Sequence, residues 1–163
     1  SSLSLIIVLK MSSSGSKGGK WTNTLVFTDH LDDGSFREAS LNKEELLDYF
    51  KELKTNEEEI RKVKIWKYHI IPFLGYFGLW HEFTVVESTN WYWSFEKQMD
   101  SIYVQRSKKL TDVKEYMGKK KRGKTVFPEG RFNDDIKYKE KIYNIIEWII
   151  NNDELSNTYH GTQ

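Results

Sequence analysis

The fold is decided by three neighbouring segments, Leu79-Trp-His-Glu-Phe-Thr-Val-Val-Glu87, Trp91-Tyr-Trp-Ser-Phe-Glu-Lys97 and Ile102-Tyr-Val-Gln-Arg106. Each segment is short, rich in aromatic and β-branched side chains, and separated from the next by a polar turn, which is typical of β-strands. Consecutive strands joined by tight turns pair as an antiparallel meander. We therefore predict a small antiparallel sheet over about residues 79–106.

Helical patterns lie on both sides of this sheet. Asn42 is a capping residue, and it precedes Leu46, Leu47 and Phe50 at helical spacing. Helices are predicted over residues 42–54, briefly from Asn56, over about 110–118, and over about 134–151, where isoleucines form a wide apolar stripe along a long C-terminal helix. Strand composition also recurs over residues 21–27 and 63–71. Because no βαβ alternation is present, the predicted class is α+β, with helices flanking the sheet.

The N-terminal region is expected to stand apart from the rest of the chain. Residues 3–9 read Leu-Ser-Leu-Ile-Ile-Val-Leu, a predicted strand, and residues 11–19 form a serine- and glycine-rich flexible connector. The predicted organisation is residues 1–19 as strand plus connector and residues 20–163 as one α+β domain. An apolar strand on a flexible tether can add to the sheet of a neighbouring subunit, which predicts a homo-oligomer.

Composition excludes several classes of protein and of site. The chain has 163 residues, enough for one domain with a real core, and 25 basic against 24 acidic residues, too balanced for a global attraction to nucleic acid or membrane. It contains no cysteine, so it has no disulfide and no thiol nucleophile. The longest uncharged apolar stretch is far shorter than a membrane span, so a soluble, cytoplasmic protein is expected.

No cofactor and no metal are predicted. The glycines do not form a phosphate-binding loop, and no Gly-x-Ser-x-Gly motif is present. No two of the four histidines have the spacing of two metal ligands on one helix face.

His81 is the strongest candidate for catalytic chemistry. A histidine acting as a general base needs a polar group to orient its ring, and the next predicted strand carries Ser94 and Glu96. The alternative interpretation is a half-buried structural histidine whose nitrogens bind backbone groups or a neighbouring carboxylate.

Positive charge is concentrated in one part of the chain. The candidate nucleic-acid-binding residues are Lys119, Lys120, Lys121, Arg122, Lys124 and Arg131. Together with nearby aromatic side chains they have the composition of a single-strand binding surface. The alternative is an ordinary solvated loop, since no nucleic-acid motif accompanies the run.

The order of elements around His81 resembles the permuted papain-like superfamily, in the branch of lecithin:retinol acyltransferase-like and viral H-box proteins. The resemblance covers roughly residues 75–160. It implies that His81 is the catalytic histidine and that Glu96 or Ser94 is its orienting residue. Two features depart from the family: Glu-Phe-Thr follows the histidine, and the nucleophilic cysteine is absent. Without a thiolate the covalent chemistry of the family cannot run.

These observations lead to three hypotheses of function. The leading one is a non-catalytic interaction or structural domain related to the H-box papain-like proteins, which binds a protein partner through its aromatic strand surface. Ser1 and Gln163 resemble cleavage scars of a viral polyprotein, which suggests a viral source. The alternatives are a fragment of a thiol acyltransferase or hydrolase whose cysteine lies outside this sequence, and a single-stranded nucleic-acid-binding module.

Overall fold

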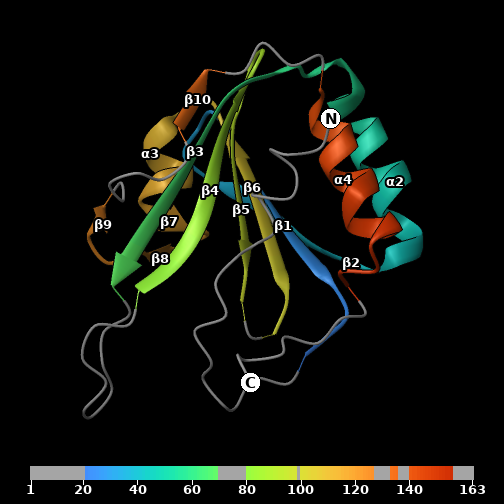
Figure 1. Cartoon of the computed structure of the whole chain (residues 1–163), viewed down its shortest axis with the longest axis horizontal. Coiled ribbons are helices and arrows are strands. Elements are labelled where there is room, and N and C mark those ends of the chain that lie inside the picture. Colours follow the sequence, from blue (N-terminus) through green and yellow to red (C-terminus); the bar gives the residue numbers. More distant parts are fainter. Residues whose placement is uncertain (1–20, 70–79, 99, 127–132, 136–139, 156–163) are drawn as a thin grey trace.

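The structure is a computed structural model that describes residues 21–69, 80–98, 100–126, 133–135 and 140–155. Eight strands of these residues form one sheet in the order β10-β3-β4-β5-β6-β1-β2, with β9 also pairing with β3 (Figure 1). The strands are β1 (Leu25–His30), β2 (Phe36–Leu41), β3 (Ile60–His69), β4 (Trp80–Ser88), β5 (Tyr92–Lys97), β6 (Ile102–Ser107), β9 (Thr125–Val126) and β10 (Asn133–Asp135). The helices are α2 (Lys43–Glu52), the 3-10 helix η1 (Thr55–Glu57), α3 (Leu110–Lys114) and α4 (Ile142–Asn151), and a separate hairpin pairs β7 (Tyr116–Met117) with β8 (Lys120–Lys121).

The chain is α+β, but the expected small antiparallel sheet flanked by helices is wrong. β4, β5 and β6 pair antiparallel, yet they are only the centre of a large mixed sheet in which β1 lies parallel to β6. β3, which precedes β4 in the sequence, extends the sheet on one side, whereas β10, β1 and β2 come from residues far from the meander. Pairing over such distances, with a long connection before a parallel neighbour, leaves no signal in any short stretch of sequence.

The predicted helices are partly confirmed. Asn42 caps α2 as expected: its side chain accepts a hydrogen bond from the Glu45 backbone N–H at 3.0 Å, and Glu45 in turn accepts one from the Asn42 N–H at 3.4 Å. The long C-terminal helix is wrong, because Asp134 and Asp135 belong to β10 and α4 begins only at Ile142. The segment from Asn56 forms only the short helix η1, and α3 ends at Lys114.

One face of the sheet is apolar, and α2 and α4 cover it side by side (Figure 1). Phe27 and Phe50 lie in this core with their rings edge-on at 5.0 Å between centroids. The fully buried side chains here include Leu25, Phe27, Leu46, Phe50, Ile60, Trp93, Phe95, Ile102, Ile142, Ile145 and Ile146. Burying each side chain of this size stabilises the fold by about 1.5–3 kcal/mol, so this core is a main source of stability.

The opposite face of the sheet carries polar and aromatic side chains. Because strand side chains alternate between faces, the register aligns Tyr68 of β3 with His81 of β4, and Ser94 of β5 with Gln105 of β6, all on this second face. Residues 108–124, which we call the cap, lie over it and contain α3, β7 and β8 (Figure 1).

The cap is held against the sheet at both ends. Val113 of α3 is fully buried and packs on Phe83 and Val85 of β4. Near the other end, a Cβ atom at Gly123 would lie 2.9 Å from the backbone oxygen of His69, too close for any side chain. Glycine is therefore required where the cap passes the end of β3.

The predicted N-terminal strand and connector, residues 1–19, lie outside the described residues. The division of the chain at residue 20 stays a prediction.

Candidate functional site

His81 lies on β4 beneath the cap and is 7% exposed. Its Nε2 atom is 3.1 Å from Glu96 Oε1 on β5, and its ring packs edge-on against Tyr68, with 5.4 Å between centroids. The predicted pairing of His81 with a carboxylate on the next strand is therefore present in the structure. Ser94, the other predicted partner, is 1% exposed and aligns with Val85, four residues further along β4 than His81.

Glu96 is fully buried and is the centre of a polar cluster. Its Oε1 accepts a hydrogen bond from the Tyr68 hydroxyl at 2.8 Å, and its Oε2 accepts from Gln98 Nε2 at 3.2 Å and from an Arg122 terminal nitrogen at 3.3 Å. Burial by itself raises the pKa of Glu96, but the Arg122 guanidinium, followed by His81 and the Tyr68 hydroxyl, outweighs it and lowers that pKa to about 2. Glu96 is consequently an anion at neutral pH.

The negative charge of Glu96 also affects the pKa of the Tyr68 hydroxyl. Burial, and then the charge and hydrogen bond of Glu96, raise the pKa of the Tyr68 hydroxyl well above its ordinary value. The phenol thus stays protonated and donates to Glu96 at every pH near neutrality. We define the Glu96 cluster as Tyr68, His81, Glu96 and Arg122.

Arg122 connects this cluster to the cap. One terminal nitrogen of its guanidinium donates to the backbone oxygens of Val113 at 2.7 Å and Tyr116 at 2.6 Å, and the other reaches Glu96. Its guanidinium carbon lies 3.9 Å from the centroid of the Phe83 ring, a cation–π contact. A fork of several donors suits arginine to this role, whereas lysine offers a single point charge. Arg122 therefore fastens α3 and β7 to the sheet.

Gln105 makes a second connection of the same kind. Its side-chain nitrogen donates to the backbone oxygen of Tyr116, and its side-chain oxygen accepts from the Gly118 N–H at 3.3 Å and contacts His30 Nε2 at 2.8 Å. Gly118 has a φ of +59°, which favours glycine at this turn between β7 and β8. The cap is thus held by two buried side chains, Arg122 and Gln105, from opposite sides of the interface.

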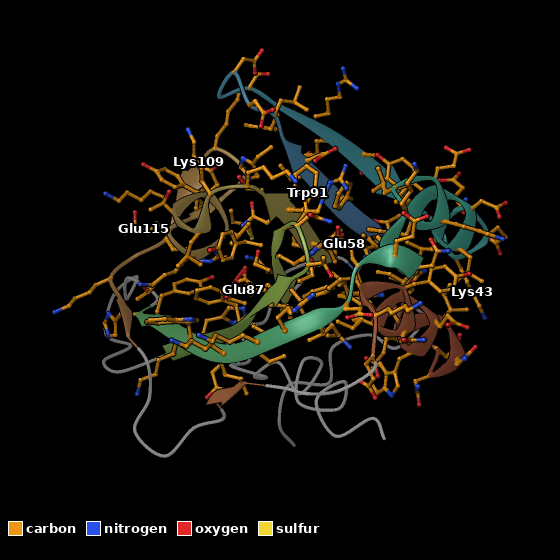
Figure 2. The ribbon with its side chains drawn as sticks, turned by 90° about the horizontal axis from the view of Figure 1, so that it is seen from above. Lys43, Glu58, Glu87, Trp91, Lys109 and Glu115 are labelled. Atoms are coloured by element: carbon orange, nitrogen blue, oxygen red, sulfur yellow. The ribbon has the colours of Figure 1, made fainter. Side chains whose placement is uncertain are left out.

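Of the six predicted nucleic-acid-binding residues, the structure describes five, and these divide into two groups. Lys119, Lys120, Lys121 and Lys124 are exposed, as a binding surface requires. Arg122 is 7% exposed and points into the Glu96 cluster, so its assignment to that surface is wrong. Arg131 lies outside the described residues. Figure 2 shows Lys109 and Glu115 of the cap across the molecule from Lys43 on α2.

Several members of the site were not singled out from the sequence. Tyr68 stands between Lys67 and His69, and Gln105 stands between Val104 and Arg106, so no flanking apolar pattern marks either residue as internal. The same is true of Arg122, which stands within a run of lysines. Only the three-dimensional position of the cap distinguishes it from them.

The Glu96 cluster shares only some features with a catalytic histidine that is oriented by a carboxylate. His81 Nε2 and Arg122 Nε are buried and make no well-aligned hydrogen bond with any described residue. The hydroxyl beside His81 belongs to Tyr68, which already donates to Glu96, and the sequence contains no thiol. The geometry holds charges in place and offers no nucleophile within the cluster.

In the part of the chain that the structure describes, no group of three or more histidine or acidic side chains is arranged to hold a metal ion. None of the helices found there has the length and apolar character to cross a bilayer. The chain matches no known family model, no curated protein and no solved structure.

Proposed function

We propose that this chain is a non-catalytic interaction domain in which the sheet and the Glu96 cluster fix the cap, and the outer surface of the cap contacts the partner. The observation that supports it most is the use of Glu96. The carboxylate that would orient His81 for catalysis binds Arg122 and Tyr68 at the same time, in a fully buried position. A buried ion pair of this kind favours a defined structure more than it favours chemistry.

The aromatic surface that the sequence suggested for the partner is largely internal. Trp93, Phe95 and Phe83 are fully buried, and they serve as core residues. Within the cap, most of the exposed side chains are lysines. The contact surface is therefore assigned to the cap.

The relationship to the papain-like superfamily stays a prediction, as does self-association through residues 3–9. The family's thiol chemistry would need a cysteine from outside this sequence. A mass measurement with and without residues 1–19 tests self-association, and an unchanged mass would contradict it.

The test of the proposed function is a comparison of the whole chain with His81→Gln and Glu96→Gln. The rate of hydrolysis of activated esters is measured for all three proteins, and the free energy of unfolding of each protein is measured in parallel. Both substitutions should lower the free energy of unfolding by about 1–3 kcal/mol, because buried hydrogen-bonding groups lose their partners, and all three proteins should show only background rates. Turnover by the unmodified chain that disappears in a folded His81→Gln variant would contradict the proposal.

A further inference from the structure

Three lysines at the rim of the cap each lie over an aromatic ring of the sheet region. Lys114 Nζ is 4.0 Å from the centroid of the Trp66 ring, and Lys108 Nζ is 3.9 Å from that of Trp91. Lys119 Nζ lies 5.9 Å from the Phe36 ring. The three rings are half-buried and come from three different parts of the chain: β3, the turn before β5, and β2. Lysines at the rim of the cap are thus paired with half-buried aromatic rings, and the Trp91 ring also has the Arg106 guanidinium carbon 3.9 Å from its centroid.

Charge is strongly separated between the cap and the helical side of the molecule. Residues 108–124 contain eight basic and two acidic residues, whereas residues 42–59, which include α2, contain three basic and seven acidic residues. The net charge of the whole chain is close to zero because the basic cap and the acidic region of residues 42–59 balance each other. Figure 2 shows Lys109 on the cap and Lys43 on α2 far apart in the molecule. An anionic ligand would therefore be drawn to the cap, and repelled from α2.

The basic side chains that face outward on the cap are lysines, because its one arginine is turned into the Glu96 cluster. Those exposed are Lys108, Lys109, Lys119, Lys120, Lys121 and Lys124. Lysine contacts phosphate as a point charge and lacks the planar fork with which arginine reads guanine. The surface is suited to a phosphate backbone without preference for sequence.

We propose that the cap binds single-stranded nucleic acid, with its lysines on the phosphates and with Phe36 and Trp66 as stacking faces for unpaired bases. This inference rests on the proposed function and names the class of its partner. A base that stacks on a ring displaces the lysine above it toward the adjacent phosphate, so each lysine–ring pair serves one nucleotide. In a duplex the bases are stacked on one another, so they are not available to stack on these rings.

An anionic membrane is the other polyanion to which such a surface could bind. Membrane surface binding combines basic residues with an apolar face that enters the lipid. Among the described residues, Leu110 is the one large apolar side chain that is clearly exposed, at 41%. A single leucine makes no such face, and half-buried rings beneath lysines favour bases instead.

The experiment measures binding of a fluorescent 20-nucleotide oligo-dT to the full chain by anisotropy over a range of salt concentrations. Lys120→Ala/Lys121→Ala on β8 is compared with Lys43→Ala/Lys51→Ala on α2, which removes the same charge from exposed positions at the other pole. Affinity should fall with salt, and the cap variant should bind several-fold more weakly with a log–log salt slope smaller by about 1.4. The α2 variant should bind at least as well as the unmodified chain.

A second variant, Phe36→Leu, separates stacking from charge. It keeps an apolar side chain on β2, and it should weaken oligo-dT binding by about fivefold or more while leaving the salt slope unchanged. A duplex of the same length and vesicles of phosphatidylserine in phosphatidylcholine are the competing probes. Both should bind more weakly than oligo-dT.

Four results would overturn the proposal: no binding of oligo-dT at low salt, equal losses in the two lysine variants, equal affinity for the duplex, or preferential binding to vesicles. None of them involves His81-dependent turnover, which is the result that contradicts the proposed function. The two failures are therefore distinguishable in one set of proteins.

Discussion

The two faces of the sheet use the same strands but are stabilised in different ways. On the face covered by α2 and α4, apolar side chains such as Phe27 and Trp93 make up the core, and the Arg106–Asp29 ion pair lies beside it. On the face covered by the cap, the centre is an ionised carboxylate, Glu96, surrounded by Arg122, Tyr68 and His81. The helices are held mainly by burial of apolar side chains, whereas the cap is held by the buried Val113 together with the polar contacts of Arg122 and Gln105.

This difference explains why a short, lysine-rich segment can be ordered on a folded protein. The cap includes only one short helix and a two-stranded hairpin, and by itself it buries little apolar surface. Arg122 and Gln105 supply directional contacts that an apolar interface of this size would lack. Apart from Lys114, the cap lysines are left exposed, and Lys108 Nζ donates a hydrogen bond to the backbone oxygen of Asn90 at 3.0 Å.

The largest effect is expected on the apolar face. Phe27→Ala removes a ring that contacts Phe50 and Tyr49 and leaves a cavity in a fully buried position, so the free energy of unfolding should fall by about 3–5 kcal/mol. Urea unfolding followed by tryptophan fluorescence measures this loss. A decrease below about 1 kcal/mol would mean that the helices do not depend on this core as described.

A loss of similar or slightly smaller size is expected on the cap face, but with a different origin. Arg122→Met leaves Glu96 buried without its cation, which should cost about 3–5 kcal/mol. In a Glu96→Gln background the same substitution should cost at least about 1 kcal/mol less, because no uncompensated charge remains. The neighbouring exposed residue provides the control: Lys121→Met should change stability by no more than about 0.5 kcal/mol. Additive losses in the double variant would contradict the ion pair.

The smallest of the three effects is the response to acid. The pKa of Glu96 is about 2 in the folded chain, below its ordinary value of 4.5, so its contribution to stability is present above pH 4.5 and is lost as the pH falls through about 2. Between pH 6 and pH 2 the unmodified chain should lose on the order of 3 kcal/mol more than Glu96→Gln. Unfolding by urea at several pH values measures the two curves. Parallel curves would show that Glu96 is not held as an anion.

The same contrast between faces determines which parts of the fold can be predicted from the sequence. The pattern of α2 is local, and its cap at Asn42 and its buried Leu46 and Phe50 follow from propensity and spacing within one short stretch. The meander of β4, β5 and β6 is local for the same reason. The parallel pairing of β1 with β6 joins residues more than 70 positions apart, and the sheet was consequently predicted too small.

The sequence predicts only the part of the candidate site that lies on β4 and β5. His81 and Glu96 lie on adjacent strands of a hairpin, so alternation is enough to place them on one face. Arg122 comes from a distant segment that looks like solvated loop, and it was assigned to the surface. The buried cation that accounts for the state of Glu96 was therefore missed.

The sequence by itself determined the alternation of the strands, the capped helix α2, the absence of a thiol and the concentration of lysines over residues 108–124, because each of these is a property of residue types at short spacing. The tertiary structure alone decided which strands are neighbours, which basic residue is internal and which are left outside. The physical reason is that charge–charge and hydrogen-bond energies depend on distances across the fold, and Arg122 comes within 3.3 Å of Glu96 only when the cap lies on the sheet.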